Sequence, residues 1–266
     1  MSSDLYDLFE NDDDGHNDDH RHDDATEHRD GSGGSDDGGS HDGDSHDGSG
    51  DDGFDHSDDD VMSGGDSDDH LDGGVGRDDI HGRDGDDDLH GGLDDDVIYG
   101  NVGSDFLYGD DGADVLYGGQ HLDHVEGGIG DDRLYGNLGD DTLDGGEGAD
   151  WLHGGQGDDI ASGGAGDDVL NGGLGNDLLN GGAGADQFVF AGLSGNDTIS
   201  DFDPTGGDLI VRSALAGVGP ASVEELLANV TTDASGDAVV DFGAGQSVTL
   251  IGVSAEDLSA ANFQLL

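Results

Sequence analysis

The sequence predicts an all-β fold in which two short parallel sheets stack face to face, and three observations predict it. Residues 64–189 divide into 14 units of nine residues with no insertion or deletion. Position 1 of every unit is Gly, position 6 is Asp and position 8 is apolar. A fixed short period of this kind is typical of repeat architectures in which each unit packs only on its neighbours.

Each unit is expected to form a six-residue turn followed by a three-residue strand, with Gly at positions 1, 2 and 4 supplying positive φ angles. Alternate side chains of a strand point to opposite faces, so position 8 should point inward and positions 7 and 9 outward. If two units make one coil, 14 units give seven coils. The outward column includes four tyrosines, for which stacking between neighbouring units is the favoured interpretation: Tyr99, Tyr108, Tyr117 and Tyr135. The expected inward column is Leu71, Ile80, Leu89, Ile98, Leu107, Leu116, Val125, Leu134, Leu143, Leu152, Ala161, Leu170, Leu179 and Phe188.

The charge of the chain indicates a cationic ligand. The net charge is −60, and in residues 64–189 alone 30 Asp and 2 Glu face 3 Arg. A chain so acidic and so poor in apolar residues should not fold unless its charge is neutralised. The Asp at position 6 should lie beside the equivalent turn one coil along, so that carboxylates and loop carbonyls form hard oxygen sites. Ca²⁺ accepts 6–8 such oxygens in flexible geometry, whereas Mg²⁺ demands a tight octahedron, so we expect roughly a dozen Ca²⁺ ions between the turns.

The 14 units closely resemble the G-G-x-G-x-D-x-U-x nonapeptide of the RTX (repeats-in-toxin, hemolysin-type) family. Residues 184–266 are similar to the C-terminal region of serralysins, in GADQFVF, SGNDTISDF, GGDLI and SVTLIGVSAEDLSAANF. The resemblance implies a right-handed parallel β-roll with Ca²⁺ held between turns by the position-6 aspartates. The implied ligands are Asp69, Asp78, Asp87, Asp96, Asp105, Asp114, Asp123, Asp132, Asp141, Asp150, Asp159, Asp168, Asp177 and Asp186.

Several units depart from the family pattern. Ala161 should underfill the core, and a residue other than Gly at position 4 predicts a distorted turn or a missing site. Residues 103–114 and 127–186 are therefore the stretches expected to bind best. The substituted glycine positions are Ser67, Asp94 and His121 at position 4, and Arg83, Asn101, Asp110 and Asn137 at position 2.

The flanking regions differ in composition from the repeats. Residues 1–63 are rich in Asp, His, Gly and Ser and are predicted to be a disordered acidic tail, although its seven histidines leave open a loose transition-metal chelator. Residues 55–63 form a degenerate leading unit with Asp60 and Met62 in phase. Residues 190–266 are predicted to be a small mixed cap, with strands in DTISDF, GDLIVRSAL and GDAVVDFGAGQSVTLIGV and short helices in PASVEELLANV and SAEDLSAANF.

Composition also excludes several classes of protein. A chain with six basic residues lacks the cationic surface that nucleic acids and anionic membranes require. It has no cysteine, no apolar run of transmembrane length and no basic, apolar signal peptide at its start. The resemblance instead implies an uncleaved C-terminal signal read by a type I secretion apparatus, and the ending AEDLSAANFQLL is similar to such signals.

Catalytic motifs are absent from the sequence. It contains neither H-E-x-x-H nor G-x-S-x-G, and no EF-hand spacing. The favoured function is a secreted, extracellular, non-enzymatic calcium-binding protein whose roll folds where Ca²⁺ is abundant. Two alternatives stay open: a calcium-dependent adhesin or matrix protein that binds acidic polysaccharide through its tyrosines, and an enzyme with a cryptic site.

Overall fold

The computed structural model describes residues 59–191, 194–213, 220 and 222–266. Almost all of the predicted tail at 1–63, with its seven histidines, lies outside these residues, and the two interpretations of it stay predictions. The described residues belong to one compact unit, Gly43–Leu266. None of the helices in these ranges is long and apolar enough to cross a membrane.

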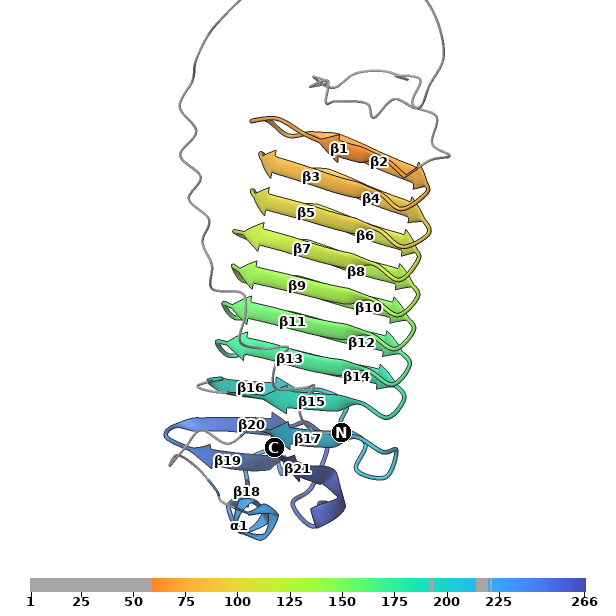
Figure 1. Cartoon of the computed structure of the whole chain (residues 1–266). Coiled ribbons are helices and arrows are strands. Elements are labelled where there is room, and N and C mark those ends of the chain that lie inside the picture. Colours follow the sequence, from red (N-terminus) through yellow and green to blue (C-terminus); the bar gives the residue numbers. More distant parts are fainter. Residues whose placement is uncertain (1–58, 192–193, 214–219, 221) are drawn as a thin grey trace, which may run out of the picture. The chain divides into compact units, whose positions relative to one another are not determined.

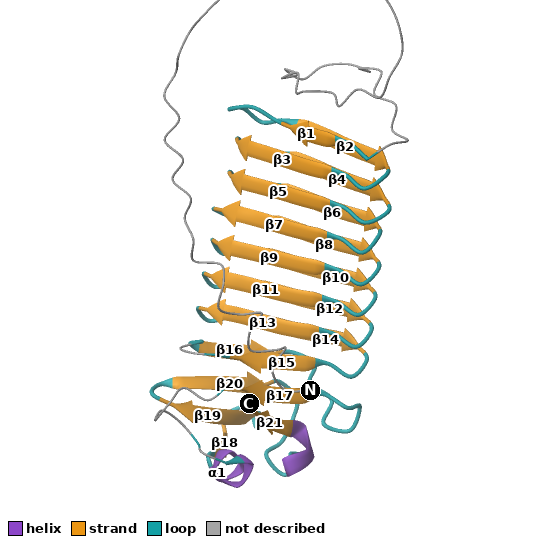
Figure 2. Cartoon of the chain, viewed as in Figure 1, coloured by secondary structure: helices purple, strands orange, loops and turns teal. Residues whose placement is uncertain are grey.

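Two mainly parallel sheets run side by side through this unit (Figures 1 and 2). One sheet, in spatial order, contains β1 Val61–Ser63, β3 Asp79–Asp84, β5 Val97–Val102, β7 Val115–Gln120, β9 Arg133–Leu138, β11 Trp151–Gln156, β13 Val169–Leu174, β15 Gln187–Phe190, β17 Leu209–Arg212 and β21 Phe263–Leu265. The other contains β2 His70–Val75, β4 Asp88–Leu93, β6 Phe106–Asp111, β8 His124–Ile129, β10 Thr142–Glu147, β12 Ile160–Ala165, β14 Leu178–Ala183, β16 Asn196–Ile199, β20 Gln246–Leu250, β19 Ala238–Gly243 and β18 Val230–Thr232.

Successive strands alternate between the two sheets, so that two nine-residue units make one coil. Leu152 in β11 pairs with Leu134 in β9 and with Leu170 in β13, each 18 residues away. The all-β parallel solenoid is therefore confirmed, and it has about eight turns. The count of 14 repeats and the right-handed sense of the roll stay predictions.

The division of each unit into turn and strand was wrong. The strands of the roll are six residues long and cover positions 7–9 of one unit and 1–3 of the next, leaving a three-residue turn at positions 4–6. The strand is longer than expected because pairing resumes after position 1. Gly155 and Gln156, at positions 2 and 3, pair with Gly173 and Leu174 one coil along.

The reason given for Gly at position 1 was also wrong. Gly146 and Gly148, at positions 2 and 4, have φ angles of 103° and 147°, as expected. Gly145, at position 1, is not among the residues with positive φ. A Cβ on Gly145 would stand 2.5 Å from the carbonyl oxygen of Gly163 and would also collide with the Oδ2 atom of Asp150. Position 1 is Gly because two neighbouring chain segments approach it too closely for any side chain.

The substituted glycine positions adopt left-handed backbone at six of seven sites. At position 4, φ is 78° at Asp94 and 84° at His121, whereas most glycines there lie between 124° and 157°. These two turns are therefore distorted, as predicted, while Ser67 has no positive φ. The four position-2 residues also have positive φ, and they are Arg83, Asn101, Asp110 and Asn137.

The core is the predicted column of position-8 side chains between the two sheets. It is buried from Ile80 to Phe188, and Leu71 packs against it partly buried. Ala161 occupies its place in the column and is 1% exposed. Met62 extends the column at the N-terminal end and pairs with Ile80, which confirms the phase of the leading unit.

Both sheets continue into the C-terminal region. Strands β16 and β17 add in parallel to β14 and β15, and β19 and β20 form the predicted hairpin. The first predicted helix is present as α1, Val223–Ala228, whose N-terminus is capped by Ser222. The second was wrong. Its segment forms only the 3₁₀ turn η1, Ala260–Asn262, because the residues that follow pair as β21 with β17.

Replacing a position-1 glycine should destabilise the roll. In Gly127→Ala the new Cβ would meet the Asp132 carboxylate and stand 2.6 Å from the Gly145 carbonyl oxygen. Such overpacking costs about 1–3 kcal/mol, which a urea titration of the Ca²⁺-loaded chain would measure. Gly65→Ala is the control, because its nearest neighbour atom would lie 3.8 Å away and its φ is not positive. Equal midpoints for the two variants would contradict this account.

Candidate metal centres

The 14 predicted ligands all lie at the last position of a turn, directly before a strand. Every one of them is buried in the described structure, with at most 9% of its surface exposed. They fall into two columns, one along each edge of the solenoid, because alternate units turn at opposite edges. The structure therefore brings the predicted residues together as two stacks.

Within each stack, the aspartates are joined by hydrogen bonds from backbone to side chain. The N–H of Asp114 donates to Oδ1 of Asp132 at 2.9 Å, and the N–H of Asp132 donates to Oδ1 of Asp150 at 2.9 Å. The same bond recurs every 18 residues along both edges, from Asp60 to Asp186. These ladders of carboxylates hold each turn to the next coil.

A second row of carboxylates runs beside the first at position 5 of several turns. The N–H of Ala149 donates to Oδ1 of Asp131 at 2.9 Å, and the N–H of Asp158 donates to Oδ1 of Asp140 at 2.8 Å. In this row the N–H group donates to a carboxylate of the preceding coil. In the position-6 row the N–H group donates to a carboxylate of the following coil. Asp131 and Asp140 are exposed, so each edge has a buried row and a solvent-facing row of negative charge.

The second oxygen of the buried aspartates lacks a hydrogen-bond donor in most turns. Among the described residues, eleven of the predicted ligands have an Oδ2 atom that is buried and unbonded. A buried polar atom without a partner is costly, and a carboxylate oxygen in that state is a natural ligand for a cation. The aspartates concerned are Asp87, Asp96, Asp105, Asp114, Asp123, Asp132, Asp141, Asp150, Asp159, Asp168 and Asp177.

Burial strongly perturbs the acidity of these carboxyl groups. Desolvation raises the pKa of Asp114, Asp123 and Asp159 to about 8, against the lowering effect of the backbone N–H bond and with a further increase from neighbouring carboxylates. Desolvation raises the pKa of Asp132 and Asp150 to about 6. The arginines of the repeats are exposed, so the stack must acquire protons or metal ions to lower its charge.

Two further aspartates extend the stacks beyond the predicted set. Asp197 and Asp208 are buried, and their Oδ1 atoms accept the N–H groups of Asp177 and Asp186, both at 3.1 Å. Burial raises the pKa of Asp197 to about 8. Both precede an apolar residue by two positions, Ile199 and Ile210, as position 6 precedes position 8. That spacing is the signal that the search for a strict nine-residue period missed.

The oxygen atoms at the turns are suitable ligands for a hard cation. Besides the carboxylates, the carbonyl oxygens of Gly128 and Gly130 point along the stack, since they occupy the places where a Cβ on Gly146 and Gly148 would stand. All of these ligand atoms are oxygens, the ligand type that Ca²⁺ prefers. The repeat thus supplies the chemistry that a calcium ion needs without any nitrogen or sulfur ligand.

The tyrosine column lies on the outer faces of the sheets. On β3, β5, β7 and β9 the rings of His81, Tyr99, Tyr117 and Tyr135 stack in sequence, with centroids 4.6–5.0 Å apart. Tyr108 lies on the other sheet and stacks on His90. The tyrosines therefore stack, as predicted, but between units one coil apart and not between consecutive units. Tyr135 is buried rather than exposed.

Fold and turns together define a class of protein, the parallel β-solenoid whose turns are lined by buried aspartates. The chain belongs to the family of RTX calcium-binding nonapeptide repeats. Matches to this family cover residues 54–188, just over half of the chain, in the segments 54–89, 90–120, 117–152, 126–161 and 153–188. No curated protein sequence matches the chain.

Solved structures that are similar to part of the chain include the following two. The extracellular lipase LipA from Serratia marcescens is 23% identical over 72% of this chain and 40% of the lipase, with a TM-score of 0.39. The AlgE6R3 subunit of the mannuronan C5-epimerase from Azotobacter vinelandii is 29% identical over 61% of this chain and 80% of that subunit, with a TM-score of 0.27. The chain spans less than half of the lipase's length.

The raised pKa values predict that acid stabilises the metal-free roll. A carboxyl group whose pKa is higher in the folded chain than its ordinary 3.8 contributes stability at low pH and loses it as the pH rises through the folded value. In chelator, the β-sheet signal in circular dichroism should therefore be greater at pH 4 than at pH 8, with the loss falling between about pH 4 and 8. A signal that is flat or rises with pH in chelator would contradict this.

Proposed function

We propose that this chain is a secreted, non-enzymatic calcium-binding protein whose roll folds when it binds Ca²⁺ outside the cell. The observation that carries the proposal is the pair of stacks of buried aspartates. Their Oδ1 atoms hold the coils together, and most of their Oδ2 atoms have no hydrogen-bond donor among the described residues. A folded chain at neutral pH needs cations at these places.

The ions would lie between successive turns and be held by the 14 position-6 aspartates together with turn carbonyls. Asp197 and Asp208 would extend the two columns at their C-terminal ends. Roughly a dozen Ca²⁺ ions would then nearly cancel the net charge of the repeats. Calcium suits the stack better than Mg²⁺, because the backbone φ angles at Asp94 and His121 differ from those of the other turns. Such unequal turns require a metal ion with flexible coordination geometry.

Calcium would couple folding to location. Each extracellular-type site filled at ten times its Kd contributes about 1.4 kcal/mol to the folded state. Several such sites together reach the 5–15 kcal/mol that is typical of a whole domain. Where free Ca²⁺ is scarce this contribution vanishes, so the chain would stay unfolded in the cytosol and pass through a type I secretion apparatus as an extended polypeptide.

A calcium titration tests the folding step. The full chain in chelator should show little β signal in far-UV circular dichroism, and Ca²⁺ at millimolar concentration should restore the signal cooperatively. Mg²⁺ at the same concentration is the control and should not restore it. If the chelator-treated chain is as compact and as resistant to protease as the Ca²⁺-loaded chain, the proposal is wrong.

A single position-6 substitution tests the ligand set. Asp132→Asn removes a buried carboxylate from the ladder, so the free energy of unfolding in Ca²⁺ should fall by about 1–3 kcal/mol, measured by urea titration. Asp144→Asn makes the same change in charge at an exposed position of β10 and should alter stability by less than about 0.5 kcal/mol. Equal losses in the two variants would show that overall charge, not ligation, is responsible.

Export is tested with the full chain in a bacterial host. Co-expression with an intact type I apparatus should deliver the chain to the medium, and co-expression with an apparatus whose ATPase is inactive should not. Retention in the cells in both cases would contradict the export route while leaving the calcium-binding proposal standing.

A further inference from the structure

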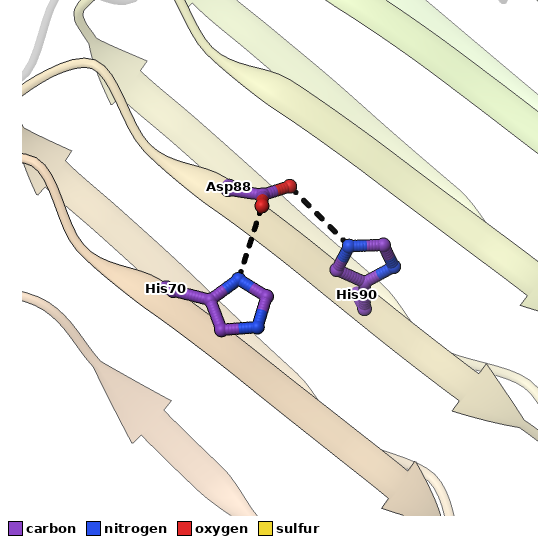
Figure 3. A group of neighbouring side chains, drawn as sticks. All are labelled: His70, Asp88 and His90. Carbon is purple, nitrogen blue, oxygen red and sulfur yellow. Dashed lines mark hydrogen bonds and ion pairs between the residues drawn. The ribbon is translucent and has the colours of Figure 1, made fainter. Parts of the chain in front are cut away.

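Two histidines and an aspartate form a compact group on the outer face of the sheet that contains β2 and β4 (Figure 3). His70 lies on β2, and Asp88 and His90 lie on β4. His70 and Asp88 are register partners, and His90 is two residues further along the same face. These side chains point away from the core and do not belong to the buried stacks of the turns.

The three side chains approach one another closely. Nδ1 of His70 lies 3.1 Å from Oδ2 of Asp88, and Nε2 of His90 lies 3.3 Å from Oδ1 of the same carboxylate. One donor atom from each residue can be chosen so that all three lie within 4.8 Å of one another. Ligands that stand about 2.0–2.1 Å from a tetrahedral zinc ion are about 3.3 Å apart, so only small side-chain movements would bring all three onto one ion.

The second nitrogen of His90 has the partner that a metal-bound imidazole usually has. Its Nδ1 lies 3.5 Å from Oδ2 of Asp110, on the neighbouring strand β6. A carboxylate at this place orients a ligating histidine and raises its basicity. The ring of His90 also stacks on Tyr108, with centroids 4.5 Å apart and an interplanar angle of 12°. His90 is therefore held on two sides in one orientation.

We propose that His70, Asp88 and His90 bind a divalent transition-metal ion, for which Zn²⁺ is the probe, at a site separate from the calcium sites. Imidazole nitrogen suits Zn²⁺, whereas Ca²⁺ selects oxygen donors. Three protein ligands leave a fourth position for water. The site stands on these contacts alone and does not depend on the proposed function of the turns.

The opposite sheet offers a matched control. Nε2 of His81 on β3 lies 3.0 Å from Oδ1 of Asp79, and its ring stacks on Tyr99 much as that of His90 stacks on Tyr108. Among the described residues, no second histidine joins His81 and Asp79 in a group that could hold a metal ion. His81 therefore reports how strongly one histidine beside one carboxylate binds the same ion.

The test is a Zn²⁺ titration of the full, Ca²⁺-loaded chain labelled with ¹⁵N-histidine. Ring signals are assigned to residues by their loss in His70→Ala, His90→Ala and His81→Ala. The signals of His70 and His90 should move together, at a Zn²⁺ concentration at least tenfold below that which moves His81. Because each signal belongs to one residue, histidines in 1–63 that bind Zn²⁺ do not obscure the result. If His70 and His90 respond no earlier than His81, the site does not exist.

Two variants make the test independent of any loss of fold. His70→Ala truncates a side chain that is 65% exposed, and it should raise the Zn²⁺ midpoint of His90 at least tenfold. Asp110→Asn should raise that midpoint by about 10-fold or more through the loss of the orienting carboxylate. Asn is tolerated there, because Asn101 and Asn137 occupy the same position of other units with φ near that of Asp110. Unchanged midpoints in both variants, with the calcium-dependent β signal intact, would overturn the assignment.

Discussion

The architecture depends on one electrostatic constraint, the burial of a carboxylate at the end of every turn. An aspartate in this place accepts a backbone N–H of the preceding coil, and it also brings a negative charge into a region where water is scarce. The first effect holds the coils at their spacing, whereas the second makes the stack unstable until a cation or a proton arrives. Under the proposed function, folding and calcium binding would be coupled for this reason.

The invariant glycine and the invariant aspartate are two halves of one contact. At Gly145 and its equivalents the missing side chain leaves room for the carboxylate five residues later and for the carbonyl of the next coil. Neither residue can change alone without loss of that contact. Most of the remaining glycines, at positions 2 and 4, adopt positive φ, and there the chain also accepts Asn, Asp, His and Arg at positive φ.

The sequence predicted the periodic part of this structure well, because three columns repeat without interruption and each has one physical explanation. The core column, the two-unit coil and the gathering of the aspartates follow from the period. The length of the strands could not be predicted from the period, since Gly-Gly pairs have little strand propensity. They pair here only because the equivalent residues of the coils on either side are also extended and can pair with them. Asp197 and Asp208 were missed because the coil lengthens by a few residues there. The segment SAEDLSAANF was assigned to a helix because the pairing of the strand that follows it, β21, with β17 is a long-range contact.

The unequal length of the last coils has a consequence for assembly. Between Asp69 and Asp177 every coil has the same length of 18 residues, so a growing stack can slip by one whole coil and keep most of its backbone pairing. The links from Asp177 to Asp197 and from Asp186 to Asp208 span 20 and 22 residues, and no other coil matches them. A stack nucleated at this end has a single alignment open to it, and growth toward the N-terminus then copies that alignment one coil at a time.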